Sequence, residues 1–430
     1  MTSPGSQQRT DSEQLTVGVA FGGVAPEHEV SVITTLQAAA AMDRERYAPV
    51  PIYVAKDGTW YTGDHLLDLD RYEDVEAVIE EATPVTVAPG AHGTLRLIEE
   101  PATGTLAHLR AGPPAQWTID VMFLGFHGGA GESGGMQGLC DLFNVPYTGS
   151  GVFGSALGMD KVRSKMICQE EDIPVVDFVA FHESEWAYQE EEGLDRCEAE
   201  IGYPMIVKPA RLGSSIGITR ADDRITLDTA IEEAFRYDDL VVVERAVTEL
   251  REINCAVLGD AQEATPSVLE EPIASDEDEV LTFEDKYMGD DGGAKEAAGT
   301  KAEAAGGAEG MASLDRIVPA ELPDEHTQEI QDLAVRIFQL FDCAGVARID
   351  FMIDEATGEL FFNEINTIPG SFSFYLWEPS DVPFERLVDR LIEIARRRHQ
   401  TKNGRVRYYD VNLLSERSLA ELTGTKADAE

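Results

Sequence analysis

A stretch near the end of the chain, ARIDFMIDEATGELFFNEIN (347–366), places charged and amide side chains along two apolar strands. Because side chains alternate across a strand, Arg348 and Asp350 share one face, and Glu364 and Asn366 share a face of the next strand. Folding the hairpin brings these pairs side by side. Two carboxylates, an amide oxygen and a guanidinium can together hold a hard cation such as Mg²⁺ with phosphate. The alternative, a solvated hairpin edge, explains the asparagine and the arginine poorly.

A second stretch, YPMIVKPARLGSSIGI (203–218), combines an apolar strand, a lysine and a Gly/Ser loop. Lys208 and the loop at 213–215 can present a positive charge and backbone N–H groups to phosphates. The Walker motif GxxxxGK[ST] is absent. Because a Gly-Ser-Ser sequence alone is more often a simple turn, this interpretation depends on the neighbouring hairpin.

Lysine is used sparingly, at nine positions against 25 arginines. We expect such a chain to keep lysine mainly where a compact cation is needed. Lys161 in SALGMDKVRSK, Lys208 after its strand and Lys286 in the acidic FEDKYM are therefore candidate site residues.

Two glycine-rich corners also follow apolar strands. In AFGGVAPEHEVS, Glu27 lies at a strand-to-helix turn, where a carboxylate can meet the ammonium group of an amino acid. The alternative is an ordinary acidic residue that stabilises a helix N-terminus. His127 follows the apolar strand IDVMFLGFH into GGAGESGG and is a better site candidate than His28, which has no evident partner in the sequence.

The order of elements indicates an α/β protein. An apolar strand at 15–23, a helical segment and a further strand predict a parallel α/β unit. We expect the following organisation: an N-terminal segment 1–14, a domain 15–150, a central unit 151–240, a C-terminal unit 241–400 interrupted by a low-complexity Gly/Ala/Glu insertion 289–313, and a tail 401–430.

Composition excludes several functional classes. The 80 acidic and 34 basic residues give a net charge of −46, which disfavours nucleic acids and anionic membranes as partners. Acids spread along the whole chain predict adaptation to high salt, with a generic acidic cytosolic protein as the alternative. The five cysteines form no CxxC pair, and the polar N-terminus has no apolar signal segment. We therefore expect a cytoplasmic protein with reduced cysteines.

Several motifs together resemble the D-alanine–D-alanine ligase family of the ATP-grasp superfamily. They occur in the family's order: GGVAPEHEVS, FHGGAGESGGMQG, PYTGSGVFGSALGMDK, IVKPARLGSSIGI, FEDKY, ARIDF and FNEINTIPG. The resemblance covers roughly residues 15–400. It implies an ATP-grasp fold, with an α+β C-terminal part and an N-terminal Rossmann-like (preATP-grasp) domain built on a parallel sheet, and it implies a homodimer.

The resemblance also implies roles for individual residues. Two Mg²⁺ or Mn²⁺ ions would be held by Asp350, Glu364 and Asn366. ATP would be contacted by Lys161, Lys208, Ser215, Glu244, Glu252 and Lys286. The catalytic group would comprise Glu27, Ser214, Tyr287, Arg348 and Gly370. The amino-acid substrates would be bound by Glu27, His127, Ser373, Tyr375 and Leu376.

The implied reaction is the ATP-dependent ligation of two D-alanines through an acyl phosphate, for peptidoglycan precursor synthesis. Tyr375 departs from the family, which usually has a serine there that helps to bind the second substrate's carboxylate; the Tyr375 hydroxyl, Ser371 or Ser373 could serve instead. Related ligases that use D-lactate, D-serine or another amino acid as acceptor are therefore the alternative. A nucleotide-binding regulator without turnover would be expected to lack part of the 348–366 set, and a nicotinamide-binding enzyme would need GxGxxG.

Overall fold

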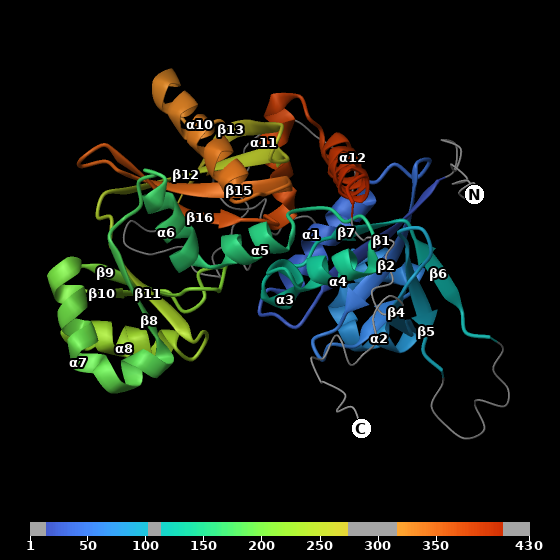
Figure 1. Cartoon of the computed structure of the whole chain (residues 1–430), viewed down its shortest axis with the longest axis horizontal. Helices are drawn as coiled ribbons and strands as arrows, with labels where there is room; N and C mark the ends of the chain where they lie inside the picture. The colour runs from blue at the N-terminus through green and yellow to red at the C-terminus, as the bar shows by residue number, and fades with distance from the viewer. Residues whose placement is uncertain (1–13, 102–112, 274–315, 407–430) are drawn as a thin grey trace, which may run out of the picture.

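The computed structural model describes residues 14–101, 113–273 and 316–406, which form three sheets (Figure 1). The expected N-terminal segment, the low-complexity insertion and most of the C-terminal tail lie outside these residues. Lys286 and Tyr287 lie outside them too, so their roles stay predictions.

The N-terminal sheet has seven strands in the order β6-β5-β4-β3-β2-β1-β7. Its elements are β1 (Leu15–Gly22), α1 (His28–Ala40), β2 (Tyr47–Val54), β3 (Trp60–Thr62), α2 (Val75–Glu81), β4 (Thr83–Pro89), β5 (Leu95–Glu99), β6 (Gln116–Ile119), β7 (Val121–Leu124), α3 (Gly129–Glu132) and α4 (Gly135–Phe143). Among the described strands of this sheet, β1 pairs in parallel with β2 and β7, whereas the strands from β2 to β6 pair antiparallel.

The expectation of a parallel sheet is therefore confirmed for three strands and wrong for the others. The turn at Asp57-Gly58 shows the physical reason, because it joins β2 to β3 within five residues. Parallel neighbours need a long crossover, such as α1 between β1 and β2, whereas a tight turn allows only antiparallel pairing.

The central sheet has four antiparallel strands in the order β10-β9-β11-β8. Its elements are β8 (Phe178–His182), α7 (Glu183–Glu200), β9 (Met205–Pro209), β10 (Thr219–Ala221), α8 (Arg224–Ala234) and β11 (Leu240–Arg245). Leu194 of α7 and Ile231 of α8 pack with Val207 and Val241 in one core. The expected boundary at residue 240 is thus wrong, because β11 lies between β9 and β8 and the next sheet begins at Leu250.

The third sheet has five strands in the order β14-β13-β12-β15-β16, all antiparallel. The elements of this part are α5 (Val152–Met159), α6 (Lys161–Glu170), β12 (Leu250–Gly259), β13 (Ala264–Pro272), β14 (Arg316–Ile317), α10 (Asp324–Leu340), β15 (Gly345–Asp354), β16 (Glu359–Asn366), α11 (Phe374–Trp377) and α12 (Phe384–Asn403). Ile337 of α10 packs on Ile253 and Phe351, while α5 and α6 contact β16. The hairpin expected at 347–366 is confirmed.

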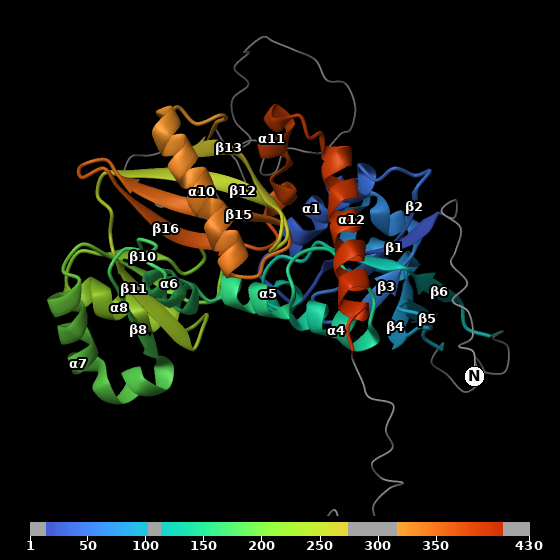
Figure 2. The ribbon, with the colours of Figure 1, turned by 45° about the horizontal axis from the view of Figure 1, so that its top comes forward.

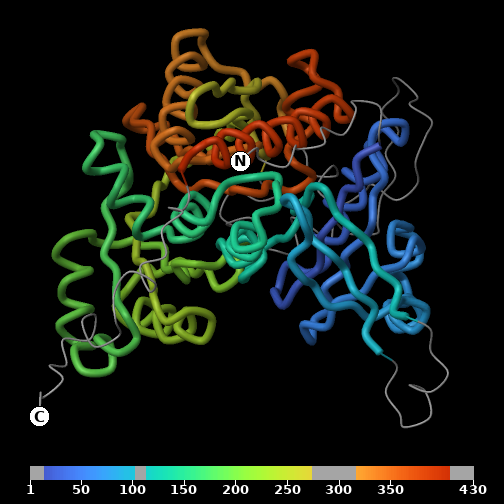
Figure 3. Tube along the Cα trace, turned by 45° about the vertical axis from the view of Figure 1, so that its right-hand side comes forward, coloured from blue at the N-terminus to red at the C-terminus, as the bar shows by residue number. Residues whose placement is uncertain are grey.

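Helix α12 links the third sheet to the first. Leu387 and Leu391 share a core with Val17 and Val19 of β1 and with Val346 of β15. Figure 2 shows α12 running between the two regions. In Figure 3 the green central region and the blue N-terminal region lie on opposite sides, below the orange and red third region. The three sheets therefore surround a common centre.

Two further expectations concern the chain as a whole. All five cysteines are buried and free, as predicted for core thiols. No helix in the described ranges is long and apolar enough to cross a membrane.

Candidate active site

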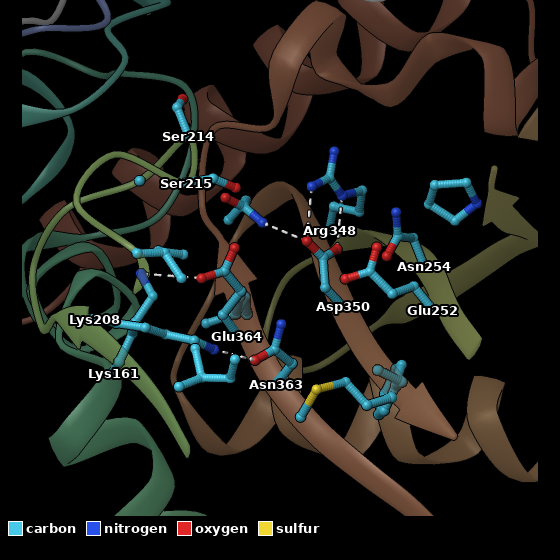
Figure 4. Close-up of a pocket in the computed structure, with 18 of the residues that line it drawn as sticks. Lys161, Lys208, Ser214, Ser215, Glu252, Asn254, Arg348, Asp350, Asn363 and Glu364 are labelled. Carbon is cyan, nitrogen blue, oxygen red and sulfur yellow. Dashed lines mark hydrogen bonds and ion pairs between the residues drawn. The ribbon is translucent and has the colours of Figure 1, made fainter. Parts of the chain in front are cut away.

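A cavity of about 1010 Å³ opens where the three sheet regions meet (Figure 4). The β15–β16 hairpin forms one wall, with Asp350 opposite Glu364 and Arg348 opposite Asn366 in the strand register. All four side chains line the cavity. The alternation that the sequence predicts therefore brings these four residues to one place.

Positively charged groups hold the carboxylates of this hairpin. Arg348 donates from Nε and Nη2 to the two oxygens of Asp350, each at 2.7 Å. Asn366 Nδ2 donates to Asp350 Oδ2 at 3.0 Å, and Lys161 Nζ lies 3.0 Å from Glu364 Oε2. Burial raises the pKa of Asp350, and the neighbouring Arg348 acts in the opposite direction. Asp350 and Glu364 are thus each paired with a cationic side chain. A ligand that binds either carboxylate must displace this side chain or share it.

Two lysines share one buried carboxylate on the adjoining wall. Lys208 Nζ lies 2.9 Å from Glu244 Oε2, and Lys165 Nζ lies 3.3 Å from Oε1 of the same residue. Asn363 connects them, because its side-chain oxygen accepts from Lys208 at 3.3 Å and its backbone oxygen accepts from Lys165 at 2.9 Å. Glu252 and Ser215 also line the cavity. Two cations around one acid leave a local positive charge suited to phosphate.

The Gly/Ser loop (213–215) lies in the cavity wall next to Glu27. Ser214 and Ser215 both adopt left-handed backbone conformations, with φ of 53° and 57°. The Ser214 hydroxyl donates to Glu27 Oε1. At Gly213 a Cβ would lie only 2.8 Å from that same oxygen, so the close approach requires glycine. The loop therefore positions the Glu27 carboxylate at the cavity wall.

His127 and Glu132 are buried next to this loop, and both line the cavity. Burial lowers the pKa of His127 to about 4, with a further contribution from Arg348, so the imidazole is neutral at pH 7. Burial and the nearby Glu27 raise the pKa of Glu132 to about 8. Glu132 accepts hydrogen bonds from the Gly128 and Ile368 backbone N–H groups at 2.8 and 3.3 Å. His127 and Glu132 are therefore neutral at pH 7, whereas the β15–β16 hairpin carries charged side chains.

Tyr375 also lines the cavity, but its hydroxyl already has a partner. The Tyr375 hydroxyl lies 3.0 Å from Glu270 Oε2, and the same carboxylate meets Arg316 Nη1 at 3.0 Å and Asn254 Nδ2 at 3.4 Å. Gly370 lines the cavity as well. The expectation that the Tyr375 hydroxyl donates to a substrate does not match this arrangement, because its one hydrogen points to Glu270.

Ser371, Ser373 and Leu376 are not among the residues that line the cavity. Ser371 donates to Gln37 of α1 at 2.8 Å, and Ser373 and Leu376 are fully buried. The tight turn at 370–373 and the short helix α11 direct these side chains into the protein. The expected roles of Ser373 and Leu376 in substrate binding stay predictions, and the burial of both side chains does not support a side-chain contact.

Sequence reasoning missed several residues of the site. They are Glu132, Lys165, Asn254, Glu270, Arg316 and Asn363. Lys165 had a usable signal, since it follows Lys161 by one helical turn and must share its face. Glu132 had a weaker one, as an acid inside a glycine-rich turn. The remaining four come from separate strands and gave no local pattern.

The oxygen donors on the hairpin fit a divalent cation that is shared with phosphate. Within the described ranges, no group of three or more His, Cys, Asp or Glu side chains is arranged to hold a metal ion. Mg²⁺ bound together with phosphates needs only one or two carboxylates, because phosphate and water complete the octahedron. Asp350 and Glu364, facing each other beside Asn366, supply such a set, which also suits Mn²⁺.

Known proteins agree with this architecture. The model described as "D-ala D-ala ligase N-terminus" matches residues 16–150, and "D-ala D-ala ligase C-terminus" matches residues 167–314 and 309–393. A D-alanine–D-alanine ligase of Thermosipho melanesiensis is 36% identical over 400 residues, which cover 93% of this chain and 98% of that protein.

Solved structures give the same result. The D-alanine–D-alanine ligase of Coxiella burnetii has a TM-score of 0.71 at 29% identity and covers 91% of this chain and 97% of its own. The VanG D-Ala:D-Ser ligase of Enterococcus faecalis has a TM-score of 0.69 at 28% identity and covers 89% of this chain and 100% of its own.

Proposed function

The chain belongs to the D-alanine–D-alanine ligase family, and we propose that it joins two D-alanines with conversion of ATP to ADP and phosphate. The observation that carries the assignment of the site is the hairpin set in the cavity: Asp350 opposite Glu364 and Arg348 opposite Asn366. The product, D-alanyl-D-alanine, serves peptidoglycan precursor synthesis.

The hairpin and the neighbouring lysines activate the first substrate. Asp350, Glu364 and Asn366 would hold Mg²⁺ or Mn²⁺, which when bound neutralises phosphate charge during phosphoryl transfer. Lys161 and Lys208 exchange their contacts with Glu364 and Glu244 for contacts with ATP phosphates. This exchange is supported by their position, since both ammonium groups already lie at the cavity wall.

The adenosine part of ATP lies against the adjoining wall. Glu244 and Glu252 hold the adenine and the ribose, and the Ser215 backbone contributes to the phosphate contacts. All three line the cavity next to Lys208.

A carboxylate is a poor acyl donor, so transfer of the γ-phosphate to D-alanine first gives an acyl phosphate.

The Gly/Ser loop side holds the first D-alanine. Glu27, fixed by Ser214, accepts the ammonium group, and the neutral His127 lies beside it. When the second amine attacks the acyl carbon, Arg348 and the Gly370 backbone N–H stabilise the oxyanion. Phosphate then leaves.

A second candidate differs only in the acceptor. By the resemblance, Tyr375 stands where the family usually has a serine, and one solved relative is named a D-Ala:D-Ser ligase. Ligation of D-alanine to D-serine, D-lactate or another acceptor is therefore the alternative. The same activation chemistry serves both.

The test is to incubate the purified chain with MgATP and D-alanine, alone and with D-serine or D-lactate, and to identify products by mass spectrometry. The net charge of −46 favours assays at both low and high KCl. In the same assay, the variant Glu364→Gln tests the proposed metal ligand on the hairpin. Glu359→Gln is its matched control, because it makes the same change on β16 at an exposed residue. D-alanyl-D-alanine and ADP from D-alanine alone support the proposal. Absence of both products at every salt concentration contradicts it.

A cytoplasmic location, a homodimer and adaptation to high salt stay predictions. A sedimentation experiment at two salt concentrations tests the oligomeric state and the salt response together.

A further inference from the structure

Three side chains from distant segments form a cluster at the Tyr375 end of the cavity. Glu270 comes from β13, Arg316 from the two-residue strand β14 and Tyr375 from α11. Arg316 Nη1 lies 3.0 Å from Glu270 Oε1, and the Tyr375 hydroxyl lies 3.0 Å from Glu270 Oε2. All three line the cavity. The cluster therefore belongs to the site, although no sequence motif joins its members.

Glu270 organises this cluster rather than facing a substrate directly. It is only 4% exposed, and Arg316, Tyr375 and Asn254 all donate to it. Burial and the neighbouring Glu270 raise the pKa of Tyr375, so the phenol keeps its proton. That single hydrogen is directed to Glu270, so the Tyr375 oxygen can only accept. A substrate carboxylate needs a donor, and Tyr375 in this arrangement is not one.

Arg316 is the donor that the cluster fixes in place. Its guanidinium carbon lies 4.1 Å from the centre of the Tyr375 ring, and its side chain is 12% exposed. Stacking on one side and the ion pair with Glu270 on the other hold the planar fork. Pairing of Arg316 with Pro272 in the β13–β14 ladder fixes its backbone. Three other arginines line the cavity, and each faces an aspartate. Arg348 directs Nε and Nη2 to Asp350, Arg220 Nε lies 3.1 Å from Asp222 Oδ1, and Arg245 Nη1 lies 3.6 Å from Asp354 Oδ2.

We propose that Arg316, held in the cavity wall by Glu270 and Tyr375, binds the α-carboxylate of the second substrate. Arg316 is thus a specificity-determining residue, and Tyr375 and Glu270 are positioning residues for it. Guanidinium and carboxylate can form two parallel hydrogen bonds, which sets both the affinity and the orientation of the acceptor. The acceptor class is a small D-amino acid or D-hydroxy acid with a free α-carboxylate. This inference rests on the proposed ligase function.

The experiment compares two acceptors that differ only at the carboxylate. D-Alaninamide has no carboxylate, so it cannot be activated and can enter only as the acceptor. With MgATP and D-alanine as donor, the ratio of kcat/KM for D-alanine to that for D-alaninamide measures carboxylate recognition. We expect Arg316→Met to lower this ratio roughly 10- to 100-fold, the range for one lost charged hydrogen bond, mainly through the acceptor KM. Arg316→Lys should restore part of it.

Two controls keep the result interpretable. Arg251→Met removes a similar pair, because Arg251 binds Glu271, the neighbour of Glu270, outside the residues that line the cavity. It should leave the ratio within about twofold of the wild type. Hydroxylamine, which attacks acyl phosphates to give a hydroxamate, reports activation of D-alanine without any acceptor carboxylate.

Each outcome decides something different. No hydroxamate and no dipeptide from the wild type contradict the ligase function itself. If the wild type makes both, an unchanged acceptor ratio in Arg316→Met overturns the role of Arg316. Equal loss of hydroxamate and dipeptide in that variant also overturns it, because the arginine would then act in activation or folding.

Discussion

The two ends of the cavity are built differently. At the ATP end, defined by Lys161, Lys208, Glu244, Asp350 and Glu364, every acid contacts a lysine or arginine within 3.3 Å. At the amino-acid end, His127, Glu132 and Tyr375 are neutral. Glu132 and Tyr375 are hydrogen-bonded there, and the charged pair beside Tyr375, Glu270 with Arg316, is buried. The difference follows from the ligands, because ATP needs mobile cations, whereas an amino acid needs donors and acceptors fixed in place.

The largest effect that we expect from this contrast concerns Glu132, which accepts two backbone N–H bonds and is protonated at neutral pH. Its pKa of about 8 in the folded protein lies above the ordinary 4.5 of the unfolded chain. The folded state therefore holds a proton that the unfolded state has lost, and stability falls as pH rises from about 4.5 to 8. The loss amounts to a few kcal/mol, at about 1.4 kcal/mol per pKa unit.

Urea unfolding of the wild type and Glu132→Gln across this pH range measures it. The free energy of unfolding of the wild type should fall relative to that of Glu132→Gln as pH rises. The difference between the two proteins should level off above about pH 8. A difference that is constant with pH would show that Glu132 is ionised in the folded state and would remove the contrast with the ATP end.

The second prediction removes one of the two cations around Glu244. Lys165 is fully buried, and its loss leaves Glu244 with Lys208 alone. We expect Lys165→Met to lower the free energy of unfolding by about 3 kcal/mol, as for other broken buried pairs. Lys402→Met is the control, because Lys402 pairs with Asp141 at the surface and should cost less than about 1 kcal/mol. Equal losses in the two variants would mean that Lys165 is not needed to compensate Glu244.

The third prediction tests the hairpin. Glu364→Gln keeps the size of the side chain but removes the charge that faces Lys161 and the metal position. Turnover should fall at least about 10²-fold, equivalent to about 2.7 kcal/mol, in a steady-state assay of ADP release. Near-normal turnover would remove Glu364 from the metal site.

The smallest effect concerns the phenol at the amino-acid end. Tyr375→Phe removes one of the three donors to Glu270 and so loosens Arg316. The acceptor kcat/KM should fall about tenfold, since a hydrogen bond to a charged group contributes about 1.5 kcal/mol. The KM for ATP should not change. If the KM for ATP changes by the same factor as the acceptor kcat/KM, Tyr375 acts on the whole domain and not on the acceptor position.

The same contrast explains how much could be predicted from the sequence. Asp350, Glu364 and Asn366 lie in one hairpin, so strand alternation alone places them together. Glu270 is 46 residues from Arg316 and 105 from Tyr375, and only the tertiary fold joins them. No periodicity encodes such a contact.

The fold shows a similar division. The elements around 15–61 and 347–366 follow from apolar runs and turn residues. The position of β11 inside the central sheet depends on which neighbours it pairs with, and so does the antiparallel order of β3 to β6. Strand order is a long-range property, and here the sequence-based boundary at residue 240 was wrong.

The separation of the two ends is tested most directly by hydroxylamine trapping and dipeptide formation in Glu364→Gln and Arg316→Met. The account predicts that Glu364→Gln loses hydroxamate and dipeptide together, at least about 10²-fold each. Arg316→Met should lose dipeptide at limiting D-alanine roughly 10- to 100-fold more than it loses hydroxamate. Parallel loss of both products in both variants would contradict it.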